Sequence, residues 1–225
     1  MCGRATYKLT WEEIVALYRL TLGTAPHNFQ PRFNVCLTTK IDAVIEQDGK
    51  RVLERMRWGL VPSWWSKPLK ELKLATFNAR AETVAEKPMF RSAFKRTRSL
   101  IPVSGYYEWQ DTPGCKQPWY FTRRDDEPIT IAGLWDEWKD KANGETLESC
   151  TMIITEPNAF VAEVHDRMPV ILEQKDFEPW LNEGGAALLR PADNDLLQKW
   201  PVSKRVNSSR SPDDDATLIE RVTIT

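Results

Sequence analysis

The sequence has no long apolar run, and its start does not resemble an export signal. No stretch approaches the roughly 18 consecutive apolar residues that a membrane-spanning helix needs. The first residues, Met1-Cys2-Gly3-Arg4, lack the basic segment followed by an apolar one that marks a signal peptide. We therefore expect no membrane partner and a protein that stays in the cytoplasm.

Histidine and cysteine are scarce among the 225 residues. The two histidines, His27 and His165, stand far apart, and neither lies at metal-ligand spacing from a cysteine. The four cysteines include no CxxC pair: Cys2, Cys36, Cys115 and Cys150. This pattern argues against a zinc site and a disulfide framework, so we expect free thiols and no metal or other cofactor.

Net charge is also small, at -1 from 31 basic and 32 acidic residues. With 41% hydrophobic and 28% charged residues, the composition is that of an ordinary globular protein and excludes a disordered chain. The charges are unevenly spread, because residues 87–98 and 199–210 hold several lysines and arginines and no acidic residue. Two interpretations stay open: a basic face that binds phosphates, or solvated charge on unrelated surfaces.

Most of the chain consists of short apolar stretches separated by turn signals such as Asp48-Gly49 and Asn143-Gly144. They are typical of antiparallel strands, which we expect at residues 43–46, 51–58, 100–110, 119–123, 129–138 and 148–155. No flexible linker or internal repeat divides the chain. We predict one α+β domain over residues 1–225, with a central curved, barrel-like, mainly antiparallel sheet, peripheral helices and a less ordered tail from about residue 208.

The first helix should begin after Thr10, because Thr10 and Glu13 match a capping box. Apolar residues then recur at helical spacing up to Leu22, and Gly23 can end the helix. Later helices are expected at residues 157–164, 174–181 and 192–200.

Cys2 is the first candidate for chemistry. Removal of Met1 would leave an α-amine and a thiol on one residue, and both are partly nucleophilic near neutral pH. The amine can form a Schiff base with an aldehyde, and the thiol can then close a thiazolidine ring. The thiol alone could instead attack an acyl group, or Cys2 could stand after Met1 by chance.

His165 and Glu108 are candidate acid/base groups. His165 precedes Asp166 and Arg167 where a short helix should give way to a strand, although a partly buried structural histidine fits the same pattern. Glu108 is flanked by aromatic residues in a predicted strand. It is desolvated if it faces inward and merely solvent-facing if Tyr107 and Trp109 face inward.

Two further segments could contact a ligand. Asn78-Ala79-Arg80 offers an amide for a sugar or base and a guanidinium for a phosphate, although turn and cap roles are common for asparagine. Trp64 and Trp65 are adjacent, so their side chains cannot both face one core, and we expect one to be exposed. An exposed tryptophan can stack on unpaired bases.

Seven motifs follow one another between residue 2 and about residue 207: Met1-Cys2-Gly3-Arg4, residues 58–65, 78–83, 105–109, 153–155 and 165–169, and Pro201-Val202-Ser203 with Val206-Asn207. In this order they resemble the SOS-response-associated peptidase (SRAP) family, which comprises abasic-site processing proteins.

The resemblance implies that Cys2, freed by loss of Met1, captures the aldehyde of an abasic site in single-stranded DNA as a stable thiazolidine cross-link. It implies that Asn78 positions Cys2 and the open sugar, that Glu108 transfers protons, and that His165 assists. Phosphate and base contacts would come from Arg4, Trp64, Trp65, Arg80, Thr155 and Arg167. The family name also suggests autoproteolysis, and DNA lyase activity is a further expectation.

By the same resemblance we expect a monomer that binds single-stranded DNA, including single-strand/double-strand junctions, and that associates with the nucleoid when bound. Where the family reads Asn-Val-Ala-Pro in a loop after the first helix, this chain has Asn34-Val35-Cys36-Leu37, which should loosen that loop. Two other functions stay open: a cysteine hydrolase using Cys2, His165 and Glu108, and a non-catalytic single-strand binder.

Overall fold

A computed structural model describes residues 2–21, 25 and 27–224, and its centre is a closed five-strand barrel. The strands follow one another around the barrel in the order β4-β3-β6-β9-β10, and β10 returns to β4. Their bounds are β3 Lys40–Gln47, β4 Lys50–Trp58, β6 Arg98–Val103, β9 Ile129–Lys139 and β10 Thr146–Thr155. All neighbours are antiparallel except β10 and β4, so the predicted α+β fold with a barrel-like, mainly antiparallel sheet is confirmed.

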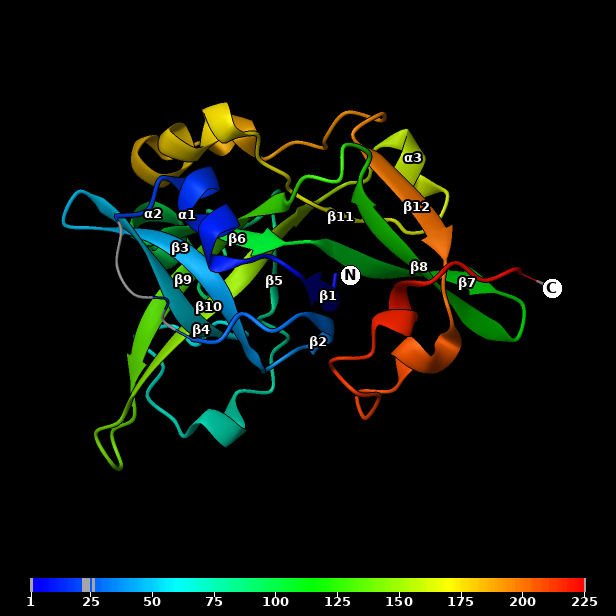
Figure 1. The fold of residues 1–225 in the computed structure, drawn as a ribbon. Coiled ribbons are helices and arrows are strands. Elements are labelled where there is room, and N and C mark those ends of the chain that lie inside the picture. Colours follow the sequence, from blue (N-terminus) through cyan, green and yellow to red (C-terminus); the bar gives the residue numbers. More distant parts are fainter. Residues whose placement is uncertain (1, 22–24, 26, 225) are drawn as a thin grey trace.

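A second, antiparallel sheet carries the N-terminus in the strand order β12-β8-β7-β1-β2 (Figure 1). Its strands are β1 Arg4–Tyr7, β2 Arg32–Cys36, β7 Gly105–Thr112, β8 Cys115–Arg123 and β12 Leu197–Pro201. Two short strands extend the barrel along β10: β5 Asn78–Arg80 and β11 Met168–Pro169.

Helices are short and lie around the sheets. The α-helices are α1 Trp11–Tyr18, α2 Arg91–Arg96 and α3 Ala159–Ala162. Single turns of 3-10 geometry are η1 Leu69–Glu71, η2 Gln174–Asp176, η4 Ala186–Leu188, η5 Lys204–Asn207 and η6 Ala216–Ile219, and η3 Pro179–Glu183 has π geometry. No helix in the described part of the chain is long and apolar enough to cross a membrane.

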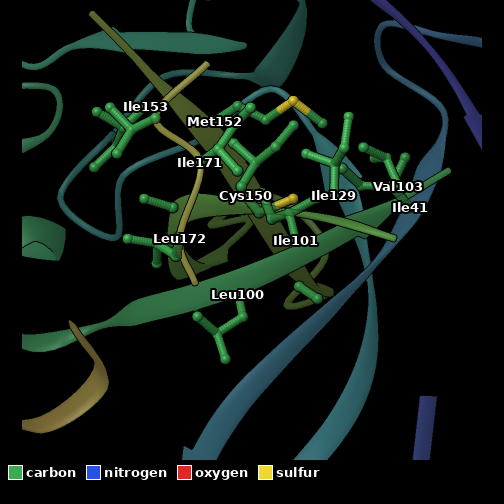
Figure 2. Close-up of a cluster of buried hydrophobic side chains, with 14 of the residues drawn as sticks. Ile41, Leu100, Ile101, Val103, Ile129, Cys150, Met152, Ile153, Ile171 and Leu172 are labelled. Carbon is green, nitrogen blue, oxygen red and sulfur yellow. The ribbon is translucent and has the colours of Figure 1, made fainter. Parts of the chain in front are cut away.

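Buried aliphatic side chains fill the middle of the molecule. Figure 2 shows side chains from β3, β6, β9 and β10 gathering with Ile171 and Leu172 in one cluster. Cys150 lies within this cluster and is fully buried, so it acts as a small apolar residue. A smaller cluster, which includes Tyr107, Tyr120 and Val202, packs against the other face of the second sheet. Both faces of that sheet are therefore covered.

Helix α1 begins as predicted. The Thr10 side chain accepts a hydrogen bond from the Glu13 backbone, and the Glu13 carboxylate accepts one from the Thr10 backbone N–H. The helix ends at Tyr18, earlier than expected, because Arg19 adopts a left-handed conformation with φ 53°. The predicted end at Leu22 and Gly23 lies outside the described residues.

Several predicted boundaries are wrong. The expected strand 100–110 breaks at Ser104, so that β6 joins the barrel and β7 joins the second sheet. The expected helix 192–200 is absent: residues 192–196 form an irregular segment and turn, and strand β12 follows and pairs with β8. Residues 174–181 form short turns, and Asn34 and Val35 lie in strand β2 and not in a loop. Other predictions are confirmed, including the β3–β4 hairpin around Asp48-Gly49.

The segment after residue 208 packs against the second sheet. Leu218 is fully buried, and the Asp213 carbonyl accepts a hydrogen bond from the Phe33 backbone N–H at 2.6 Å. The Arg32 side chain pairs with the Asp213 carboxylate, also at 2.6 Å. These contacts tie residues 208–224 to β2.

Candidate functional site

Cys2 lies two residues before the start of β1 and is fully buried. Its carbonyl oxygen accepts a hydrogen bond of 2.8 Å from Nδ2 of Asn78. Asn78 begins β5, which runs parallel to β10 with Asn78 opposite Met152. Since the Cys2 carbonyl carbon is bonded to the Cα from which the amine and the CH2–SH side chain extend, this bond restrains the residue that carries both groups.

Glu108 faces inward and is only 1% exposed. It shares one face of β7 with Tyr106, while Tyr107 belongs to the opposite face and the smaller core cluster. The pairing of Ala5 with Tyr106 places Gly3 opposite Glu108, next to Cys2. Burial, with a smaller effect of the Asp166 carboxylate, raises the pKa of Glu108 to about 7. The solvent-facing interpretation is therefore wrong.

His165 follows α3 and lies beside Glu108. Its Nε2 is 3.7 Å from Glu108 Oε2, and its Nδ1 is 3.0 Å from both the Arg167 backbone nitrogen and Asp166 Oδ1. Nδ1 cannot accept from Arg167 and donate to Asp166 at once. Burial lowers the pKa of His165, so we assign the neutral ring in which Nδ1 accepts from Arg167 and the Nε2 proton points toward Glu108.

Glu108 and His165 form part of the wall of a pocket of about 590 Å³. Gly3, which follows Cys2 in the chain, also lines the pocket, whereas Cys2 and Asn78 are buried and do not line it. The other lining residues are Leu37, Phe77, Trp109, Asp111, Lys116 and Asn207. Leu37, at the position where the family pattern has proline, thus forms part of the pocket wall.

The Cys2 thiol is in a protonated state at neutral pH. Burial, with a smaller contribution from the negative charge of Glu108, raises the pKa of the thiol well above its usual range. A thiol activated for direct nucleophilic attack has the opposite shift, produced by a nearby cation or helix N-terminus. Reaction at this thiol therefore requires a partner that accepts its proton.

Trp64 and Trp65 lie in the loop of residues 59–77 between β4 and β5. Trp64 is 50% exposed and Trp65 is half-buried, as expected for adjacent side chains. Their ring centroids are 6.2 Å apart in an edge-to-face arrangement. The loop is fastened to β9 because the Trp65 carbonyl accepts from Trp138 Nε1 at 2.6 Å and Asp136 accepts from the Ser63 N–H at 2.8 Å.

The candidate DNA-binding arginines differ in their surroundings. Arg80 ends β5 and is exposed. Arg167 pairs with Glu82. The half-buried Arg4 guanidinium donates to the side chain of Asn34 and, at 2.9 Å, to the carbonyl of Val206. Arg4 therefore ties β1 to β2 and η5.

Thr155 is buried at the end of β10, opposite Met168 in β11. Two side chains of the basic stretches are bound within the protein. The Arg98 side chain donates to the carbonyls of Phe94, Trp180 and Leu181, and Lys199 pairs with Glu163.

Within the described residues, no group of three His, Cys, Asp or Glu side chains is arranged to hold a metal ion.

Several residues of the pocket wall were not predicted from the sequence. Trp109 Nε1 donates to Oδ1 of Asn207 at 2.6 Å, which joins β7 to η5 beside the pocket. Asn207 occurs in one of the motifs quoted above, so the sequence did point to it. No motif pointed to Asp111 and Lys116, because they reach the pocket only through the pairing of β7 with β8.

Comparison with known proteins gives consistent matches. The chain is 33% identical over 220 residues to abasic site processing protein YoqW of Bacillus subtilis (strain 168), covering 94% of this chain and 96% of that protein. It is 31% identical over 256 residues to abasic site processing protein HMCES of Xenopus tropicalis, with 94% and 76% covered. A crystal structure of a protein from Bacteroides thetaiotaomicron matches with a TM-score of 0.87 and 25% identity, covering 99% of this chain and 100% of that one.

A family model described as SOS response associated peptidase (SRAP) matches residues 1–209, nearly the whole chain. Together with relatives that are more than 30% identical over almost their full length, this shows that the chain belongs to the SRAP family.

Proposed function

We propose that this protein senses abasic sites in single-stranded DNA and bonds to them covalently through Cys2 after Met1 is removed. The relatives are named abasic site processing proteins, which supports an abasic site as the lesion. The observation that carries the proposal is that Glu108 and His165 line one open pocket together with Gly3, while Asn78 holds the carbonyl of the neighbouring Cys2, although these residues come from four separate parts of the chain. The protein acts as a monomer, at single strands and at single-strand/double-strand junctions.

The reaction needs no cofactor. The α-amine of Cys2 adds to the aldehyde carbon of the ring-opened sugar, and the resulting carbinolamine loses one water molecule to give an imine. The Cys2 sulfur then bonds to the imine carbon, and the imine nitrogen takes up the proton that the thiol loses. The product is a five-membered thiazolidine, formed with the net loss of one water molecule.

Glu108 suits the proton transfers in this sequence. A carboxyl group with a pKa of about 7 can accept and donate protons at neutral pH with little change in free energy. The neutral His165 ring, whose Nε2 is 3.7 Å from Glu108 Oε2, can donate a hydrogen bond through its Nε2–H to an oxygen bound beside Glu108. The Oδ1 atom of Asn78 is buried and has no hydrogen-bond partner among the described residues, which leaves it able to accept from a sugar hydroxyl.

The raised pKa of the Cys2 thiol disfavours the cysteine-hydrolase alternative, in which the thiolate must attack first. In the proposed sequence the amine attacks first, and the thiol reacts only with an electrophilic imine. A non-catalytic strand binder would not need the Glu108 carboxyl group, which is 1% exposed. Burying a carboxyl group destabilises the fold, so its presence favours a role in the reaction.

Trp64→Ala should weaken binding to intact single strands by about 1–3 kcal/mol, the usual contribution of one aromatic–base stack. The melting temperature should change little because half of this side chain is already exposed. Leu74→Ala is the matched control, since Leu74 is an exposed apolar residue of the same loop without an aromatic ring. Equal affinity of both variants for DNA would remove Trp64 from the interface.

Arg80→Ala should weaken binding and make its salt dependence shallower by about one phosphate contact. The expectation rests on the exposed position of Arg80, two residues from Asn78. Arg91→Ala, which removes an exposed arginine at the start of α2, serves as the control. An unchanged slope of log affinity against log salt for the Arg80 variant would contradict a phosphate contact.

The direct test of the proposal uses a single strand with one abasic site. We expect an adduct that survives SDS and heating. No adduct should form with a strand carrying a tetrahydrofuran analogue, because this analogue has no masked aldehyde. An adduct of equal yield with the analogue, or none with the abasic strand, would refute the proposed function.

A further inference from the structure

The five tyrosines of this chain are all buried, but their hydroxyl groups differ in hydrogen bonding. Three hydroxyls have protein partners at 2.7–2.8 Å: Tyr18 with Thr130, Tyr107 with the Phe33 carbonyl, and Tyr120 with Thr6. The hydroxyls of Tyr7 and Tyr106 have no hydrogen-bond partner among the described residues, but the Tyr7 hydroxyl lies close to the buried carboxylate of Asp42. Tyr106 is the unpaired tyrosine beside the candidate site.

The Tyr106 hydroxyl is fully buried and has no hydrogen-bond partner among the described residues. The ring is held firmly, because it stacks on Phe121 with centroids 5.0 Å apart and planes 6° from parallel. Buried hydroxyl groups nearly always have a partner, since leaving one unpaired destabilises the fold. A rigid, unpaired donor of this kind indicates that its partner forms only during the reaction.

The strand pairing places Tyr106 beside the start of the chain. Tyr106 lies two residues before Glu108 on the same face of β7, and it pairs with Ala5, three residues after Cys2. Cys2, Tyr106 and Phe121 belong to the same buried cluster. Negative charge on either Cys2 or Glu108 raises the pKa of Tyr106 further beyond the effect of burial, so the phenol keeps its proton and stays a donor.

We propose that the Tyr106 hydroxyl donates a hydrogen bond to the Cys2 sulfur as the thiazolidine ring closes. The inference rests on the proposed function and adds a residue to it. In this step the sulfur lone pair forms the C–S bond to the imine carbon, and the S–H proton passes through Glu108 to the imine nitrogen. Without the Tyr106 donor, the sulfur would develop negative charge among apolar groups and beside Glu108.

The test compares Tyr106→Phe with wild type. Phenylalanine keeps the stack on Phe121 and removes only the unpaired oxygen, so the melting temperature should stay the same or rise. Imine formation, measured by borohydride trapping, should proceed at the wild-type rate. Formation of the stable adduct without borohydride should slow by about ten- to a hundred-fold, the usual effect of one hydrogen bond to a charged group.

Tyr120→Phe is the matched control. Its hydroxyl has a protein partner in Thr6, so its loss should lower the melting temperature and leave ring closure unchanged. A fluorotyrosine at position 106 provides a second variant that keeps ring and hydroxyl. Its more acidic phenol is a stronger donor and should accelerate closure at pH values where it stays protonated.

A second arm replaces DNA with acetaldehyde at saturating concentration. It uses the protein without Met1 and measures the increase in protein mass, which should equal one acetaldehyde minus one water molecule. Slower closure by Tyr106→Phe in both arms supports the inference. If wild type closes the ring with acetaldehyde in a Tyr106-dependent way but forms no DNA adduct, the proposed function fails and the inference stands. Closure at the wild-type rate by Tyr106→Phe in this arm would overturn the inference.

Discussion

Replacing Cys2 by alanine should abolish the SDS-stable adduct with abasic single-stranded DNA, because closing the proposed thiazolidine ring needs the thiol as well as the α-amine. Alanine keeps the α-amine, so a transient imine that borohydride can trap should remain. Affinity for intact single strands should stay close to wild type, since phosphate and base contacts carry it. Gel analysis after heating in SDS measures the adduct.

Two variants sharpen this expected result. Cys2→Ser can form only an oxazolidine, which hydrolyses more readily than a thiazolidine, so it should also give no stable product. Cys115→Ala removes an exposed thiol elsewhere and should react like wild type. Stable cross-linking by Cys2→Ala at the wild-type level would remove Cys2 from the mechanism.

Glu108→Gln should slow adduct formation by about 10²–10⁴-fold, the usual contribution of a positioned acid/base group. Glutamine keeps the size of the side chain but cannot take up or release the proton. DNA affinity should stay the same or rise, because one negative charge is lost beside the pocket. Single-turnover kinetics at saturating DNA give the rate of the chemical steps separately from binding.

The rate of adduct formation should depend on pH in a defined direction. Where ionised Glu108 accepts a proton, the wild-type rate should rise as the pH increases through about 7. In Glu108→Gln this rise should be missing, and only the rise from deprotonation of the α-amine near pH 8 should remain. Wild-type and variant profiles that superimpose would show that Glu108 has a structural role only.

Stability should change with pH in the opposite direction. The folded pKa of Glu108 is raised, so between about pH 4.5 and about pH 7 the folded protein holds a proton that the unfolded chain has released. The contribution of this group to the free energy of unfolding is therefore full below this window and falls as the pH rises through it. Denaturant titrations at several pH values should show this fall in wild type and not in Glu108→Gln.

Local signals in the sequence predicted local structure well. The capping box at Thr10 and Glu13 and the turn at Asp48-Gly49 are formed by residues close in sequence, and both occur in the structure. The predicted helix at 192–200 failed because its apolar residues satisfy a strand pairing with β8, a contact between distant segments. Pairing across such distances leaves no signal in a short window.

The face of Glu108 was undecidable from the sequence for a related reason. Alternation predicts which side of a strand is buried only when the other side meets water. Strand β7 is covered on both faces, with Tyr106 and Glu108 toward one cluster and Tyr107 toward the other. The contact between Asn78 and the Cys2 carbonyl likewise depends on β5 lying beside β10, and only the resemblance to a family indicated it.

The most direct test of the account is the intact mass of the adduct followed by peptide mapping. Wild-type protein incubated with an abasic single strand should give a species whose mass is that of the chain without Met1, plus the DNA, minus one water molecule. The modification should map to the N-terminal peptide at Cys2. An adduct that retains Met1, or one attached to a lysine, would contradict the account.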